Sequence, residues 1–176
     1  ISVRLVGSEM CIRDRDLINY DENGDYSFDT IEHGDRLSAS WGDFNNDGFP
    51  DLFLGNAVQS QLYKNNGNGT FTNVTSIAGL ETYCDTCYIA GALWLDYDLD
   101  GYLDLFLSDY NSESPNKLYK NLGDETFENI DISENITNAN SFSAIPIYAN
   151  DDSYPDIYIA NDFDQFNHCL LYTSPS

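Results

Sequence analysis

Basic residues are scarce in this chain, which has 176 residues but only 7 Lys and Arg against 30 Asp and Glu. The net charge is −23 at pH 7, with two histidines and one methionine in the whole sequence. Nucleic acid and anionic membrane surfaces repel so acidic a chain, so we exclude both as partners. The sequence also lacks an apolar run long enough to cross a bilayer and any sustained 3.6-residue period. We therefore expect neither membrane insertion nor a helical solenoid.

Both ends of the chain look foreign to the rest. Residues 5–14 and 169–176 can be encoded by two nucleotide strings, one of which is the reverse complement of part of the other. Such a pair resembles a sequencing-library adapter read at both ends of a short insert. We therefore expect residues 1–15 to be an adapter-like, disordered artefact, residues 168–176 to be a second one, and residues 16–167 to hold the fold. On this interpretation the chain is an internal piece of a longer protein.

Cysteine is sparse as well, and only Cys84 and Cys87 lie within residues 16–167. A zinc site would need two further ligands, and no other cysteine or nearby histidine supplies them. A thioredoxin-like redox site would need the pair at a junction between a strand and a helix, whereas the flanking residues indicate a loop and then a strand. The pair therefore predicts a local disulfide in an exported protein, with two inert thiols as the alternative.

The acidic residues gather in two copies of one motif, Trp41–Leu54 and Trp94–Leu107. Each copy has Asp or Asn at loop positions 1, 3, 5 and 9, a glycine at position 6 (Gly48, Gly101) and a β-type apolar run after it. Alternate oxygen side chains across a glycine turn are how a loop surrounds Ca²⁺, which takes about 6 to 8 oxygen ligands. The candidate ligands are Asp43, Asn45, Asp47, the Phe49 carbonyl and Asp51 in the first loop, and Asp96, Asp98, Asp100, the Tyr102 carbonyl and Asp104 in the second. The carboxylate count alone predicts the tighter site at the second loop.

A third copy of the loop is degenerate. Its candidate ligands are Asn150, Asp152 and Asp156, but Tyr148 stands at position 1 and Ser153 replaces the glycine. We therefore predict two Ca²⁺ sites and at most a weak third. An EF-hand or dockerin loop would have a bidentate Glu at position 12, where this chain has Leu54 and Leu107. The flanking residues are also strand-like, so we exclude that alternative.

The motifs recur at a fixed interval. Their last aspartates, Asp51, Asp104 and Asp156, lie 53 and 52 residues apart, and a second landmark of the type L-Y-K-N follows the first two. We expect units at 16–36 (partial), 37–89, 90–142 and 143–167 (partial). Four short strands are expected in the best-preserved unit, at residues 90–95, 104–108, 117–120 and 126–130. This pattern predicts an all-β fold, a fragment of a β-propeller with about three four-stranded antiparallel blades. We expect Trp41, Trp94, Phe53 and Phe106 to pack between blades.

The combination W-x-D-x-[DN]-x-D-G-x-x-D-L-F-L and L-Y-K-N-x-G-x-x-T-F resembles the FG-GAP/VCBS repeat family, the integrin α-subunit type of β-propeller. Residues 155–163 look like the branch of ASPIC/UnbV proteins and cartilage acidic protein. The resemblance implies Ca²⁺ in the inter-strand loops, export or cell-surface display, and a role in adhesion to a protein or carbohydrate ligand. It also implies neighbouring blades that are missing from this piece.

The sequence indicates a binding module rather than an enzyme. We expect a secreted or cell-surface, calcium-binding interaction module in which the metal mainly staples the fold. The alternative is a propeller part of a larger secreted lyase or hydrolase. The chain has no G-x-S-x-G motif, no glycine-rich phosphate loop and no pairing of a nucleophilic cysteine with a histidine, and His33 lies in a turn-like segment.

Overall fold

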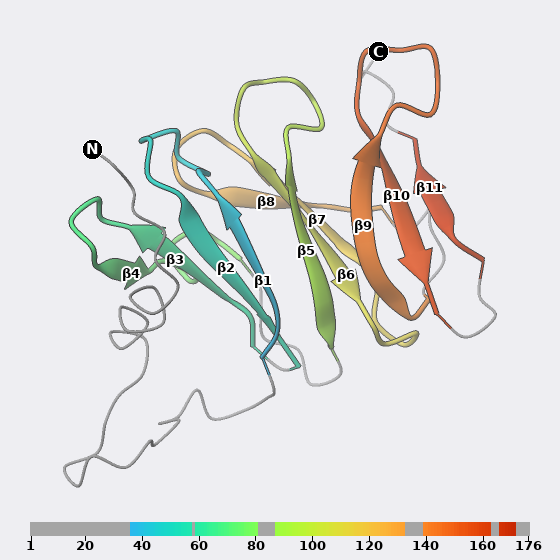
Figure 1. The fold of residues 1–176 in the computed structure, drawn as a ribbon, viewed down its shortest axis with the longest axis horizontal. Coiled ribbons are helices and arrows are strands. Elements are labelled where there is room, and N and C mark those ends of the chain that lie inside the picture. Colours follow the sequence, from blue (N-terminus) through green and yellow to red (C-terminus); the bar gives the residue numbers. More distant parts are fainter. Residues whose placement is uncertain (1–35, 58, 81–86, 133–138, 163–165, 172–176) are drawn as a thin grey trace, which may run out of the picture.

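The computed structural model describes residues 36–57, 59–80, 87–132, 139–162 and 166–171. None of these residues is helical, and their eleven strands form three antiparallel sheets that lie side by side (Figure 1). The first sheet has the order β1-β2-β3-β4. Its strands are β1 (Arg36–Gly42), β2 (Asp51–Asn56), β3 (Gln61–Asn65) and β4 (Phe71–Asn73). In the described part of the chain no helix is available to span a membrane.

The second and third sheets repeat this up-and-down order. The second consists of β5 (Ile89–Leu95), β6 (Asp104–Asp109), β7 (Lys117–Asn121) and β8 (Phe127–Ile130). The third consists of β9 (Ser141–Ile147), β10 (Asp156–Asn161) and β11 (His168–Leu170). The first strands of neighbouring sheets contact each other, β1 with β5 and β5 with β9, as the inner strands of propeller blades do (Figure 1). The predicted all-β fold, a β-propeller fragment of about three blades, is confirmed, and each sheet is called a blade below.

Strand register repeats from blade to blade because the hydrophobic pattern fixes which side chains face the neighbouring blade. The residue that ends the first strand pairs with the aspartate that begins the second: Gly42 with Asp51, Leu95 with Asp104, and Ile147 with Asp156. The same number of loop residues therefore lies between the two strands in every blade. The acidic loops all end up at the same end of the sheets.

The hydrophobic core lies between the blades. Phe53 and Leu62 of the first blade pack against Leu105, Leu107 and Tyr119 of the second. The opposite face of the second blade packs on the third through a separate cluster, whose buried members are Leu95, Tyr97, Phe106, Leu118, Ile132, Ile157, Ile159 and Leu170. The middle strands β2 and β6 are buried along their whole length, which explains their continuous apolar runs. Phe53 and Phe106 are fully buried, as expected of residues between blades.

The two tryptophans differ, and the expectation for Trp41 is wrong in the described structure. Trp94 lies over Gly42 of the first blade, where a Cβ atom would come within 2.7 Å of its ring, and it stacks on Phe44 with ring centroids 6.4 Å apart. Trp41 is 47 % exposed and makes an edge-on ring contact with Phe71 of its own blade. The reason is that the described residues include no preceding blade that could supply the counterparts of Gly42 and Phe44.

The blades begin close to the starts of the expected units. Each blade begins one or two residues before the predicted unit, at Arg36, Ile89 and Ser141. Residues 168–170, which we expect to belong to a foreign end, form strand β11, and Leu170 is buried; their foreign origin stays a prediction. Strand β11 pairs with the edge of β10 that faces away from β9, an edge that would otherwise be unpaired. The expectations for residues 1–15, for the partial unit before Arg36 and for His33 lie outside the described residues.

Candidate metal centre

Each acidic loop connects the first and second strands of its blade, and in the first two loops the first carboxylate caps the turn. In the first loop, Asp43 accepts hydrogen bonds from the amides of Asp47 at 3.0 Å and Gly48 at 2.8 Å. In the second, Asp96 accepts the equivalent bonds from Asp100 and Gly101, both at 3.0 Å. The loops therefore have the same local structure, as their sequences predict.

The last carboxylate of each loop is fully buried. Asp51 accepts the amide protons of Phe44 at 3.2 Å and Asn65 at 2.7 Å. Asp104 accepts those of Tyr97 at 3.1 Å and Asn121 at 2.7 Å. Each aspartate therefore joins its own loop to the third strand of the same blade and is held with one fixed orientation.

The backbone turns of the first two loops need two left-handed residues rather than one. Gly48 and Gly101 have φ of 87° and 92°, which is the role predicted for them, because glycine adopts positive φ without steric cost. Position 4 is also left-handed, with φ of 56° at Asn46 and 62° at Leu99. The asparagine was a signal for this conformation at the first loop, since Asn tolerates it, but the leucine gave none.

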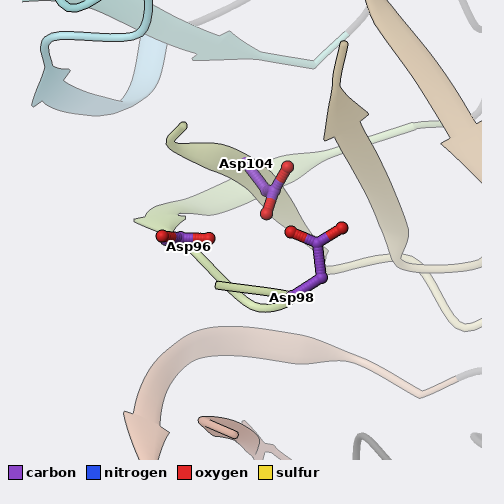
Figure 2. Close-up of side chains that lie close together, drawn as sticks. All are labelled: Asp96, Asp98 and Asp104. Atoms are coloured by element: carbon purple, nitrogen blue, oxygen red, sulfur yellow. The ribbon is translucent and has the colours of Figure 1, made fainter. Parts of the chain in front are cut away.

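Three carboxylates converge in the second loop. One oxygen each from Asp96, Asp98 and Asp104 lies within 4.8 Å of the others (Figure 2). Asp100 is not part of this group; its carboxylate accepts the amide of Tyr102 at 3.0 Å. In the described part of the chain, Asp43, Asp47 and Asp51 do not converge to the same degree. In that loop Asp47 instead accepts a hydrogen bond from the Asn45 amide group at 2.9 Å.

The residues at position 7 have a packing role that the sequence did not reveal. A Cβ atom on Gly67 would lie only 2.7 Å from the ring of Phe49. A Cβ atom on Gly123 would likewise lie 2.9 Å from the ring of Tyr102. Both glycines belong to the turn after the third strand, which therefore has to be free of side chains at this point. The predicted part of the Phe49 and Tyr102 carbonyls in metal binding stays a prediction.

The third loop keeps only part of the pattern. Asn150 and Asp152 accept the amides two residues ahead of them at 2.9 and 3.0 Å, and Asp156 accepts that of Ala149 at 2.8 Å. Tyr148 supplies no carboxylate and is 70 % exposed. Neither Asp151 nor Ser153 has the positive φ of its counterparts. The two turns that bring the ligands together in the other loops are therefore absent from residues 148–156.

Hydrogen bonds across the blades connect the first two loops. Asn46 donates from its side chain to the Gly101 carbonyl at 2.9 Å. Asn121 is fully buried and donates to the Phe44 carbonyl at 2.7 Å and to the Leu103 carbonyl at 3.0 Å. These are long-range contacts that spacing alone does not predict, although the shared L-Y-K-N landmark pointed to Asn121.

Burial changes the acidity of the last carboxylates. It raises the pKa of Asp104 from 3.8 to about 7 and that of Asp51 to about 6. Amide hydrogen bonds oppose this shift, whereas the neighbouring carboxylates add to it: Asp98 and Asp100 raise the pKa of Asp104. Both groups therefore resist ionisation unless a positive charge comes close.

The raised pKa values predict that the metal-free protein loses stability as the pH rises. Between about pH 4 and 7 the folded state binds more protons than the unfolded state, so its free energy of unfolding falls with pH. Each unit of pKa shift corresponds to about 1.4 kcal/mol, which makes the total loss on the order of several kcal/mol by pH 8. Melting curves in EDTA should give a higher Tm at pH 5 than at pH 8. A Tm that rises over this interval would contradict the raised pKa values of Asp51 and Asp104.

Cys87 is disulfide-bonded and buried. Its predicted partner Cys84 lies outside the described residues, so the pairing of the two stays a prediction.

Comparison with known proteins identifies the repeat. The family model described as FG-GAP-like repeat matches residues 43–107 and again residues 96–159. The two matches together cover the described acidic loops and most of all three blades. No curated protein matches the chain.

Proposed function

Because the chain belongs to the FG-GAP-like repeat family, we propose that it is a calcium-stabilised propeller module that binds other molecules rather than transforming them. The observation that carries the proposal is the convergence of three carboxylates in a loop whose hydrogen bonds recur one blade earlier.

The donor set fits a hard divalent cation. All candidate ligands offer oxygen, which favours Ca²⁺, Mg²⁺ or Mn²⁺ over softer metals. Oxygens that share one Ca²⁺ each lie about 2.4 Å from it and hence at most about 5 Å from one another. The grouping of Asp96, Asp98 and Asp104 within 4.8 Å meets this limit. Ca²⁺ suits the irregular loop better than Mg²⁺, which demands a near-octahedral shell.

Residues Asp96, Asp98 and Asp104 would hold the ion in the second loop, and Asp43, Asn45, Asp47 and Asp51 in the first. The ion would supply positive charge where buried carboxylates otherwise repel each other. The chain itself fixes the loop ends: the amides of Tyr97 and Asn121 orient Asp104, and Asn46 joins one loop to the next. The role of the ion is therefore structural, stiffening one end of two adjacent blades.

We also propose export or cell-surface display, with a protein or glycan as the ligand. A disulfide at Cys87 supports an oxidising compartment. Millimolar extracellular Ca²⁺ would keep such loops filled. The motif in residues 155–163 is the ground for proposing the ASPIC/UnbV and cartilage acidic protein branch.

Calorimetric titration of the full chain with CaCl₂ tests the proposal. We expect two ions per chain, because the third loop lacks the carboxylate and both left-handed turns. Asp156→Asn serves as the control and should leave the stoichiometry at two. A titration that releases or absorbs no heat, together with no retention of Ca²⁺ on dialysis, would refute calcium binding.

A further inference from the structure

Equivalent lysines on the third strands of the first two blades make different contacts. Lys120 on β7 pairs with the Asp98 carboxylate of its own acidic loop and lies 3.5 Å from that of Asp100. The side chain of Asp98 is 10 % exposed and that of Lys120 is 30 % exposed, so the ion pair is partly shielded from water. The ammonium group of Lys120 thus holds one of the three converging carboxylates.

Lys64 on β3 is turned to the neighbouring blade instead. It pairs with Glu125, which lies in the turn between β7 and β8. The same Glu125 carboxylate accepts a hydrogen bond from the Asn45 side chain of the first acidic loop at 3.2 Å. The first loop therefore has no lysine on its own carboxylates, both because Glu125 pairs with Lys64 and because Asn45 replaces the aspartate that Lys120 contacts in the second loop.

Glu125 occupies a backbone position that favours glycine. Its φ is 68°, and the equivalent residue of the first blade, also two positions before a phenylalanine, is Gly69 with φ of 89°. A glutamate in this region has a conformational cost that its contacts must offset. Its contacts with Lys64 and Asn45 across the blade boundary are the compensating interactions that the structure provides.

The lysine contacts change the balance of charge in the two loops. The second loop has four carboxylates, but Lys120 lies on two of them. The first loop has three carboxylates, and Lys64, the equivalent of Lys120, pairs with Glu125 instead of with them. A divalent cation that enters the second loop must displace the ammonium group of Lys120 or share the carboxylates with it. A cation that enters the first loop does not compete with a lysine.

We propose that Lys120 is an internal counter-ion that competes with a divalent cation for the second loop, and that Glu125 keeps the first loop open to the cation by holding Lys64 away. This inference rests on the proposed calcium binding and goes beyond it by assigning opposite roles to two equivalent lysines. Lys120 then reduces the advantage in affinity that the carboxylate count alone gives the second loop. The second loop keeps a cation of its own when calcium is withdrawn.

The lysine competition is tested in the full chain with CaCl₂ as the probe. Asp43→Ala disables the first loop, so the remaining affinity reports the second. In that background Lys120→Met should lower the Kd for Ca²⁺ about tenfold, because methionine keeps the apolar stem and removes the charge. Lys117→Met removes the same charge from the same strand away from the loop and should change the Kd less than about twofold. In EDTA, Lys120→Met should have a lower Tm than the parent chain, because the ion pair with Asp98 is lost.

A rescue experiment tests the proposed role of Glu125 in holding Lys64 away from the first loop. With the second loop disabled by Asp96→Ala, Glu125→Gln should raise the Kd of the first loop about tenfold, because Lys64 is then free to approach it. Adding Lys64→Met to Glu125→Gln should restore the original Kd, as a coupled pair requires. Circular dichroism with strand content equal to that of the parent chain shows that each variant is folded, and Lys120→Gln replaces Lys120→Met if the latter is not.

The outcomes distinguish a failure of the lysine competition from a failure of calcium binding itself. An unchanged or higher Kd for Lys120→Met, with calcium still bound, overturns the competition and leaves the proposed function in place. A double variant that stays as weak as Glu125→Gln overturns the role of Glu125. If neither the parent chain nor any variant binds Ca²⁺ saturably, both the competition and the proposed function are wrong.

Discussion

Replacing Asp104 by alanine is expected to cost about 4 kcal/mol of unfolding free energy in calcium and clearly less in EDTA. The calcium-dependent part is the loss of a bound ion, worth about 2.7 kcal/mol at a hundredfold excess over its Kd. The calcium-independent part comes from the buried amides of Tyr97 and Asn121, which lose their acceptor. Such an orphaned donor costs about 1–3 kcal/mol, offset in part because a reluctantly ionised carboxylate disappears.

Urea unfolding with and without Ca²⁺ measures the two parts. Asp156→Ala is the matched control, because Asp156 is also fully buried and also accepts an amide, that of Ala149, at 2.8 Å. Its loss should be the same in calcium and in EDTA. If Asp104→Ala showed no larger loss in calcium than Asp156→Ala does, the second loop would have no metal role.

Truncating Phe106 to alanine is expected to lower the free energy of unfolding by about 3–5 kcal/mol. Phe106 is fully buried between the second and third blades, among Leu95, Leu118 and Ile157, so its removal leaves a cavity that both blades line. The loss should be the same with and without calcium, because Phe106 lies in the apolar cluster rather than in the loop.

The control for this prediction is Phe142→Ala on β9. Phe142 is 61 % exposed, so its truncation should change the unfolding free energy by less than about 1 kcal/mol. Urea midpoints at an unchanged slope give both values. Equal effects of the two truncations would show that the blades do not share a packed interface in solution.

The sequence predicted the features that depend on local spacing. The distance from Asp96 to Asp104 and the glycine at 101 determine a turn of fixed length, so the loop and the strand after it followed from the motif alone. The degenerate third loop was predicted for the same reason, because the missing carboxylate at Tyr148 and the missing glycine at Ser153 are visible in the chain. Continuous apolar runs likewise identified the central strands β2 and β6.

Features set by contacts between blades could not be predicted from the sequence. Lys64 and Lys120 occupy identical places in the repeat, but Lys120 pairs with Asp98, whereas the first loop has Asn45 at that position and Lys64 pairs with Glu125 of the next blade. The exposure of Trp41 depends on whether a preceding blade is present, which a pattern within one blade does not report. Leu99 adopts a left-handed conformation because the loop around it requires it, against its own preference.

We expect a divalent cation to stabilise the acidic loops of this propeller fragment. The most direct test is the Tm of the full chain at pH 7.5 in EDTA and then in excess CaCl₂. Two filled loops at a hundredfold excess over Kd contribute about 5 kcal/mol, which for a chain of this size predicts a rise of about 10–20 °C. A Tm that is the same in EDTA and in CaCl₂ would contradict the account.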